Sequence, residues 1–386
     1  MSPIIYIYRL QPSSKRCPVP SKPKILVTSA GGKTGLPVTL QLLEKGFPVR
    51  AFLRRQDHRA VLLKRAGAEV FVGNQYALAD MRRAMAGVRR AYQCAPTAPN
   101  GLHFNAVFTV AANEAALEHV VTLGQWLTAC DHPSLFTREV YLSDALIRLA
   151  PNMTVTSINP GWFADNYLMV IDMAAHLGLF TMPLGPGHEK KNAPPSNEDI
   201  ARVVVAALAD PDRHAGRTYR PTGPELMSPD EIAAAMGRAL GRKVRYQNIS
   251  EKMMTKALRA MPPSNFSEAA VSQLAIYAEE YRRGAFAVSA PTRHVEDVGG
   301  HAPESFESIT RRLVARRPDL RRSISRTARA LFGFTRIALT PALDLDRIQS
   351  SRDYVRLETP RFAQETPDWV QSHDFTQATA PATRVA

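Results

Sequence analysis

The order of elements along residues 24–55 constrains the fold of this chain more than any other feature. Residues 24–28, KILVT, form a short apolar run that predicts a buried parallel strand. The glycine-rich loop 29–35 follows, and leucines then recur at helical spacing through residues 36–46. The segment PVRAFLRR at 48–55 is then expected to form the second strand. Strand, glycine loop, helix and strand in this order form the opening βαβ unit of a dinucleotide-binding fold.

The loop has the glycine spacing that a pyrophosphate requires. Gly32 and Gly35 stand three residues apart, as the second and third glycines of the pattern G-x-x-G-x-x-G, whereas Ser29 replaces the first. Such glycines let the backbone approach the phosphates, and the helix N–H groups point at their charge. A Walker A loop is excluded because Val27 stands where that motif needs a glycine. An ordinary surface loop is the alternative. We predict that the pyrophosphate is bound by Ser29, Gly31, Gly32, Lys33, Thr34 and Gly35.

Two arginines end the second predicted strand, where the ribose of the nucleotide is recognised. An acidic residue roughly 20 positions past the glycines would bind the 2′-hydroxyl of NAD. Arg54 and Arg55 occupy this place instead, and a guanidinium group suits a 2′-phosphate. We therefore predict that NADP(H) is preferred over NAD(H). The alternative is that both arginines are solvated surface residues of a basic half.

Strands and helices continue to alternate as far as residue 126, which predicts a parallel α/β sheet. Further strands are expected at 69–73, 91–96 and 119–126, with helices at 78–88 and 104–117. Ligands bind at the carboxyl ends of such strands. The residues expected to line the cofactor cleft are Asn74, Gln75, Cys94, Ala95, Pro96, Gly124 and Gln125. For Cys94, a small residue beneath the cofactor is favoured over a redox thiol.

Four segments together resemble the NmrA-like family of atypical short-chain dehydrogenases/reductases. They are VTSAGGKTG at 27–35, GAEVFVGNQ with LADMRRAMAGV at 67–88, NPGWFADNYL at 159–168, and TGPELMSPDEIAAAMGRALGRKVRY at 222–246. The resemblance covers about residues 24–300. It implies a Rossmann domain, a smaller C-terminal lobe and NADP(H) bound between them.

The resemblance also suggests roles for individual residues. It implies that Gly32, Lys33 and Gly35 hold the pyrophosphate and that Arg54 holds the 2′-phosphate. Asn74 stands where relatives often have an acidic residue near the adenine. The nicotinamide end would be walled by Pro160, Gly161 and Phe163.

The serine, tyrosine and lysine of an ordinary short-chain dehydrogenase are missing. Gly124 and Gln125 stand where the serine would end the fifth strand. Tyr141 lies in the expected region, but Ala145 stands four residues on, where the lysine should be. Arg138 falls near the position at which some relatives carry a lone functional lysine. Tyr141 and Arg138 are therefore weak catalytic candidates, and the alternatives are a packed helix aromatic and a surface charge.

The chain divides into four predicted parts within an α/β fold of the Rossmann type, a doubly wound parallel sheet. Residues 1–22 form a flexible N-terminal extension, and residues 23–180 the NAD(P)-binding domain. Residues 181–300 form a smaller α/β substrate lobe interleaved with that domain. Residues 301–386 form a basic, mostly helical extension with a disordered tail. In the lobe, Ser196 and Ser228 predict helix N-caps, and the stripe Leu274, Tyr277 and Tyr281 indicates core packing or, alternatively, a substrate pocket.

The formal net charge of +14 raises the question of a polyanionic partner. Residues 301–340 contain nine arginines against three acidic residues. After Pro318, an amphipathic helix is predicted from the spacing of Leu320, Ile324, Ala328 and Leu331, with Gly333 following and Arg321, Arg322, Arg326 and Arg329 off the apolar face. Docking on its own protein or on a homo-oligomer mate is the favoured interpretation. Contact with an anionic membrane through residues 319–332 is an alternative, and nucleic-acid binding is disfavoured because no DNA-binding motif surrounds the helix.

Several protein classes are excluded by what the sequence lacks. No apolar run is long enough to cross a membrane, and the histidines and cysteines show no metal-binding spacing, so no metal site is predicted. Cys17, Cys94 and Cys130 are an odd number, which favours free thiols in the cytoplasm. The leading hypothesis is an oxidoreductase that transfers hydride to a small carbonyl or quinone. The alternative is a non-catalytic NADP(H)-sensing regulator that binds a protein partner.

Overall fold

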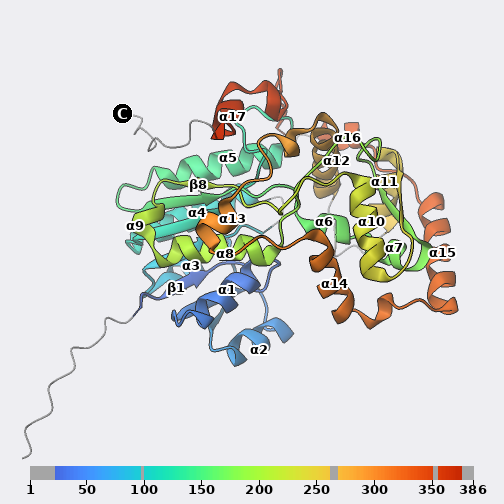
Figure 1. The fold of residues 1–386 in the computed structure, drawn as a ribbon. Coiled ribbons are helices and arrows are strands. Elements are labelled where there is room, and N and C mark those ends of the chain that lie inside the picture. The colour runs from blue at the N-terminus through green and yellow to red at the C-terminus, as the bar shows by residue number, and fades with distance from the viewer. Residues whose placement is uncertain (1–21, 97–99, 261–267, 351–354, 376–386) are drawn as a thin grey trace, which may run out of the picture.

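The computed structural model describes residues 22–96, 100–260, 268–350 and 355–375. Its centre is a seven-stranded parallel sheet with the strand order β3-β2-β1-β4-β5-β6-β8, flanked by helices (Figure 1). The order of strands reverses between β1 and β4, and this is where a doubly wound sheet opens a crevice at the carboxyl ends of its strands. The predicted Rossmann-type fold is confirmed.

All five strands predicted in the first half of the chain are present, and each is shorter than the segment predicted for it. The strands of the sheet are β1 (Ile25–Val27), β2 (Val49–Leu53), β3 (Glu69–Val72), β4 (Arg90–Gln93), β5 (His119–Leu123), β6 (Thr154–Ile158) and β8 (Thr218–Tyr219). The runs at 48–55 and 91–96 extend past the last ladder pairs because the chain leaves the sheet there to form the crevice.

Both faces of the sheet are covered by helices, and alternate strand residues supply the two cores. Ile25 and Val27 pack against one group of helices, and Leu26 packs against the other. The first group is α1 (Gly35–Glu44), α2 (His58–Arg65), α8 (Asn197–Ala209) and α13 (His294–Gly299). The second group is α3 (Leu78–Met85), α4 (Gly101–Glu114) and α5 (Leu135–Arg148). Burial on both sides explains the continuous apolar runs of the central strands.

A smaller lobe surrounds a second, two-stranded sheet of β7 (Leu179–Met182) and β9 (Arg245–Asn248). Its helices are α6 (Ala164–Leu168), α7 (Ile171–Leu177), α10 (Pro229–Leu240), α11 (Glu251–Ala260) and α12 (Glu268–Arg283), and η1 (Ala285–Ala287) follows them. Between β7 and β9 the chain returns to the large sheet through α8, α9 (Pro211–His214) and β8. Ser196 and Ser228 cap α8 and α10 as expected, the latter through a full capping box with Glu231.

The C-terminal extension wraps around both parts. Its elements are α14 (Phe306–Arg316), η2 (Pro318–Leu320), α15 (Ile324–Leu339), α16 (Leu345–Gln349), η3 (Ala363–Glu365) and α17 (Pro367–Ser372). Helix α14 packs on α10, and α15 lies against α7 and α11 (Figure 1). Helix α17 is joined to the loop after β5 by the hydrogen bond from Trp369 to the Trp126 carbonyl. The helix expected after Pro318 begins later than predicted and continues through Gly333 to Leu339.

Two of the three arginines of α14 form ion pairs with carboxylates of the described chain. Arg312 pairs with Glu198 and Glu304, and Arg311 pairs with Glu307. The predicted disordered end, residues 376–386, and all of the predicted N-terminal extension except Lys22 lie outside the described residues. No helix in the described ranges is both long and apolar enough to cross a bilayer. Nor do three or more metal-binding side chains gather anywhere in the part of the chain that the structure describes.

Candidate functional site

The glycine loop turns sharply between β1 and α1. Ser29 adopts a left-handed backbone with φ of +48°, the conformation that a glycine would provide at this position. The Ser29 carbonyl oxygen accepts a hydrogen bond from the Gly32 N–H at 2.7 Å. A Cβ on Gly32 would lie 3.0 Å from that oxygen, and one on Gly35 would overlap it. The turn therefore tolerates serine at its first position, leaves little room for a Cβ at Gly32, and requires glycine at Gly35.

The loop presents a bare backbone and a helix N-terminus to the crevice. The first turn of α1 contains no acidic residue, and the first N–H groups of a helix lack intrahelical partners. Lys33 reaches across from the loop to Asp165 of α6, with 3.0 Å between its Nζ and the carboxylate. A pyrophosphate fits this arrangement because the N-terminus of α1 favours an anion and no acidic side chain stands in its first turn.

Buried polar residues support the loop from below. The Cys94 N–H donates to Thr28 Oγ1 at 2.8 Å, and the Cys94 carbonyl accepts from Ser29 Oγ at 2.9 Å. The Cys94 thiol lies 3.5 Å from Thr34 Oγ1, and its burial raises its pKa. Gln75 is buried and accepts from Ser29 Oγ at 3.4 Å. Cys94 and Gln75 thus brace the loop, and a protonated thiol suits the interpretation of Cys94 as a small residue beneath the cofactor.

Exposed arginines surround the carboxyl end of β2. Arg54 and Arg55 follow the strand directly and are exposed. Arg59, in the first turn of α2, donates to the Gly31 carbonyl at 3.4 Å. It also forms an ion pair with Asp57, with 3.0 Å between Arg59 Nε and Asp57 Oδ2. This guanidinium holds the pKa of Asp57 well below its usual range. Sequence reasoning missed Arg59, although the D-x-R spacing at a helix N-cap is a signal that could have revealed it.

The remaining predicted cleft residues differ in their exposure. Asn74 is exposed, and its side-chain oxygen accepts from the Tyr76 N–H at 3.0 Å. A Cβ on Gly124 would overlap the Asn159 side-chain amide, which would have to move. Pro160 and Gly161 are buried, whereas Pro96 and Phe163 are half-buried. The side chains of Pro96 and Phe163 are therefore the more accessible at the ends of β4 and β6.

A polar cluster at the end of β5 joins three distant elements. The Tyr277 hydroxyl of α12 donates to Gln125 Oε1 at 2.6 Å, and Thr137 Oγ1 of α5 lies 3.3 Å from both. The Gln125 Nε2 atom is buried and has no hydrogen-bond partner among the described residues. An unsatisfied buried N–H costs about 1–3 kcal/mol, so a ligand oxygen that accepted from it would recover this energy. The Gln125 cluster (Gln125, Thr137 and Tyr277) is thus a donor site at the carboxyl edge of the sheet.

The two weak catalytic candidates lie toward the C-terminal extension. Arg138 is buried, and its guanidinium donates to the carbonyls of Val355 and His132, the latter at 3.3 Å. Burial, with added effects of Cys130 and of Asp368 in α17, raises the pKa of Tyr141.

The end of the extension contacts Trp126, the residue that follows Gln125. Trp369 of α17 is buried and donates from Nε1 to the Trp126 carbonyl at 2.9 Å. His132 accepts from the Ser134 N–H through Nδ1, so its Nε2 donates to Glu280, 2.8 Å away. Glu280 also accepts from the Ala363 N–H at 2.7 Å. These partners are far apart in sequence, and no sequence signal identified them.

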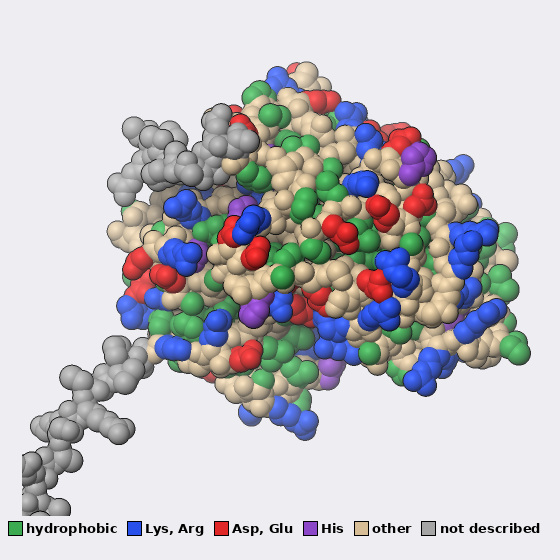
Figure 2. Space-filling model, viewed as in Figure 1, with side chains coloured by type: hydrophobic (Ala, Val, Ile, Leu, Met, Phe, Trp, Pro, Cys, Tyr) green, Lys and Arg blue, Asp and Glu red, His purple; other side chains and the backbone are tan. Residues whose placement is uncertain are grey.

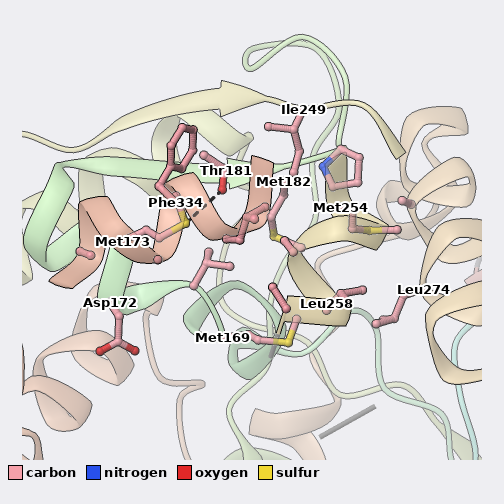
Figure 3. Close-up of a pocket in the computed structure, with 18 of the residues that line it drawn as sticks. Met169, Asp172, Met173, Thr181, Met182, Ile249, Met254, Leu258, Leu274 and Phe334 are labelled. Carbon is pink, nitrogen blue, oxygen red and sulfur yellow. Dashed lines mark hydrogen bonds between the residues drawn. The ribbon is translucent and has the colours of Figure 1, made fainter. Parts of the chain in front are cut away.

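An apolar pocket of about 310 Å³ lies between the smaller lobe and α15 (Figure 3). Leu274 of α12 lines it, while Tyr277 on the same helix contacts Gln125 and Tyr281 is buried in the lobe's core. Within the predicted stripe of α12, Tyr281 therefore packs in the core, and Leu274 lines this apolar pocket. The labelled lining is mostly flexible and apolar, with Met169, Met173, Met182, Met254, Ile249, Leu258 and Phe334.

Comparison with known proteins identifies a family, a relative of similar sequence and two solved structures of similar fold. Residues 21–290 match the NmrA-like family. The NAD(P)H azoreductase of Xenophilus azovorans is 30% identical over 261 residues, covering 67% of this chain and 89% of that protein. The crystal structure of an NADPH-dependent quinone oxidoreductase of Escherichia coli with NADPH superposes with a TM-score of 0.65 at 21% identity, covering 75% and 99% of the two chains. The structure of NmrA, a negative transcriptional regulator, with NADP gives 0.65 at 16% identity, covering 78% and 97%.

Proposed function

The chain belongs to the NmrA-like family of NAD(P)-binding proteins, and from that premise we propose that it is an NADPH-dependent reductase of a small carbonyl or quinone. The observation that carries this proposal is the Gln125 cluster. It places a buried amide N–H, without a partner among the described residues, at the carboxyl end of β5. This edge of the sheet is where a dinucleotide crosses the crevice.

Each group of the chain has a separate role in this proposal. A bound nicotinamide would supply the hydride. Gly32, Gly35 and the N-terminus of α1 hold the pyrophosphate. The Gln125 amide donates to the oxygen of the acceptor and stabilises the negative charge that develops on it. Tyr277 acts as a positioning residue, because its hydrogen bond to Oε1 turns the Nε2 atom of Gln125 away from itself. The acceptor takes its proton from water.

Turnover is the direct test of a reductase. We expect NADPH to be oxidised in the presence of at least one acceptor from a panel of quinones, azo dyes and aldehydes. Gln125→Ala should lower kcat while the Kd of NADPH, measured by nicotinamide fluorescence, stays unchanged. A tight NADPH complex that remains unoxidised across the whole panel would contradict the proposal.

The preference for NADP(H) is supported by the charges around β2. Arg54 and Arg55 are exposed. Asp57 is the next acidic residue along the chain, and its carboxylate already pairs with the Arg59 guanidinium and caps the N-terminus of α2. This end of β2 therefore offers guanidinium groups to a 2′-phosphate and no free carboxylate to a 2′-hydroxyl. We expect Arg54→Glu to weaken NADPH at least about tenfold, since a charge-assisted bond becomes a repulsion. NADH affinity should change little.

A matched control separates this effect from a change in net charge. Arg65→Glu makes the same charge change at the other end of α2 and should leave both affinities as they are. Equal losses of NADPH and NADH in Arg54→Glu would overturn the assignment of the 2′-phosphate.

The rival hypothesis is a non-catalytic regulator that senses NADP(H) and binds a protein partner. It is favoured by the missing tyrosine–lysine pair on α5, where Ala145 follows Tyr141 by one turn. Its structural relative NmrA is described as a negative transcriptional regulator. A sensor predicts tight NADPH binding with no turnover, so the same acceptor panel distinguishes the two hypotheses.

A further inference from the structure

Helix α15 carries apolar side chains on two opposite sides, and only one side covers the protein. Its inner side lines the apolar pocket with Ala330, Gly333, Phe334 and Ile337. The outer apolar face consists of Ile324, Leu331, Phe332 and Leu339, whose side chains are 92%, 54%, 71% and 86% exposed. Four large apolar side chains on one exposed helix are unusual for a surface that meets only water.

The four exposed residues form one continuous face. At about 100° per residue they fall within an arc of roughly 100°, on the side opposite to Gly333 and Ile337. The stripe predicted from Ile324, Ala328 and Leu331 therefore points away from the protein. The helix docks on its own protein, but through its other side.

The charges of α15 differ from those of α14. The helix contains three arginines, Arg326, Arg329 and Arg336, and no acidic residue. Arg321 and Arg322 precede it and are exposed. No acidic side chain in the described ranges forms an ion pair with any of these five arginines, whereas Arg311, Arg312 and Arg317 are all paired. Figure 2 shows basic and hydrophobic side chains together along the right-hand edge, where α15 lies.

We propose that the outer apolar face of α15 binds the surface of a membrane that contains anionic lipid. The helix would lie in the interface, with its large apolar side chains among the acyl chains and with Arg321, Arg322 and Arg329 at the headgroups. Arg326 and Arg336 instead donate to the backbone carbonyls of Arg321 and Ala260. Its inner side still covers the apolar pocket, so the pocket would lie directly above the membrane surface.

Charge and shape favour a lipid surface over the other partners. A second copy meeting this face across a two-fold axis would place arginines against arginines with no acid between them. A nucleic acid would meet four large apolar side chains where it needs polar contacts to its phosphates. An anionic bilayer matches both the apolar face and the exposed Arg321, Arg322 and Arg329.

The experiment uses the full chain and two kinds of vesicle, phosphatidylcholine alone and phosphatidylcholine with about one third phosphatidylserine. In co-sedimentation at low salt we expect at least about tenfold stronger partitioning to the anionic vesicles. Raising the ionic strength to about 0.5 M should remove most of this difference, because salt screens exposed charges.

Variants on the exposed side locate the contact. Phe332→Ser combined with Leu339→Ser should reduce partitioning at least about tenfold, because both side chains lose their apolar contact with lipid. These positions are exposed, so the fold is retained, which an unchanged thermal unfolding temperature would verify. Leu149→Ser changes a side chain that is 79% exposed at the end of α5, and it should bind vesicles like the parent protein.

Three results would overturn the proposal. The first is equal binding to both kinds of vesicle, or to neither. The second is a Phe332→Ser/Leu339→Ser variant that partitions like the parent. The third is a dimer, seen by light scattering, or a DNA complex that this variant loses while vesicle binding is absent; either would assign the face to a second copy or to a nucleic acid.

Discussion

The glycine loop and the Gln125 cluster lie at the same edge of the sheet but are built in different ways. The loop is one contiguous segment, and its shape follows from the Ser29 backbone and two close approaches at Gly32 and Gly35. The cluster combines residues from three elements, with 152 positions between Gln125 and Tyr277. The first can be disrupted by adding a single methyl group, whereas the second depends on how the extension and the lobe pack on the sheet.

The strongest test of this contrast removes the buried anchor of the extension. We expect Trp369→Ala to lower the free energy of unfolding by about 3–5 kcal/mol, because a fully buried tryptophan and its bond to the Trp126 carbonyl are lost. NADPH affinity at low temperature should remain, since the loop lies elsewhere. Urea unfolding and nicotinamide fluorescence measure the two quantities.

A control for that variant lies next to it in the sequence. Val370→Ala removes a side chain that is 49% exposed and should cost less than about 1 kcal/mol. If Trp369→Ala abolished NADPH binding under conditions where the protein is folded, the loop and the extension would not be independent.

The reverse test adds one methyl group to the loop. Gly35→Ala places a Cβ onto the Ser29 carbonyl, and the turn must shift away from the pyrophosphate. We expect NADPH affinity to fall about 100-fold, in line with the cost of overpacking a rigid site. Gly333→Ala on α15 is the control, because its Cβ would meet no atom within 4 Å. Equal losses in the two variants would refute the close approach as the cause.

Acid should lower the free energy of unfolding through two buried histidines. Burial, followed by the charge of a nearby arginine, lowers the pKa of His119 on β5 to about 4 and that of His373 beside α17 to about 3. Above the ordinary value of 6.5 both are neutral in either state. As the pH falls below 6.5 the unfolded chain takes up protons first, so stability decreases until the folded values are reached. At pH 5 each histidine should cost about 2 kcal/mol.

Urea unfolding at about pH 7.5 and pH 5 measures this loss. His373→Gln cannot titrate and should reduce the difference in unfolding free energy between the two pH values by about 2 kcal/mol. The exposed His58→Gln should leave it unchanged. An identical pH dependence in the parent and in His373→Gln would show that this histidine is not the titrating group.

The smallest expected effect separates two tyrosines. Tyr277→Phe removes the hydrogen bond that orients the Gln125 amide, so we expect kcat to fall about tenfold with an unchanged Kd for NADPH. Tyr141→Phe should have no effect on either, because Tyr141 lies toward Cys130 and Asp368 rather than in the cluster. The opposite ranking would return Tyr141 to the catalytic role considered from the sequence.

Much of the fold was predictable because its signals are local. Apolar runs marked β1 to β5, and serines three residues before an acidic residue marked the starts of α8 and α10. Such patterns depend on neighbours within one turn or one strand. The direction of α15 was not predictable, since both of its sides are apolar and periodicity cannot tell which one packs.

By itself, the sequence determined the parallel sheet, the glycine loop and the basic end of β2, because strand, turn and helix preferences act over a few residues. Only the tertiary structure decided that Ser29 can replace a glycine, that Arg59 and Asp57 pair beside the loop, and that Tyr277 meets Gln125. It also turned Arg138 toward backbone carbonyls of the extension. These outcomes depend on contacts between distant segments, whose geometry is set by the packing of the whole chain rather than by spacing along it.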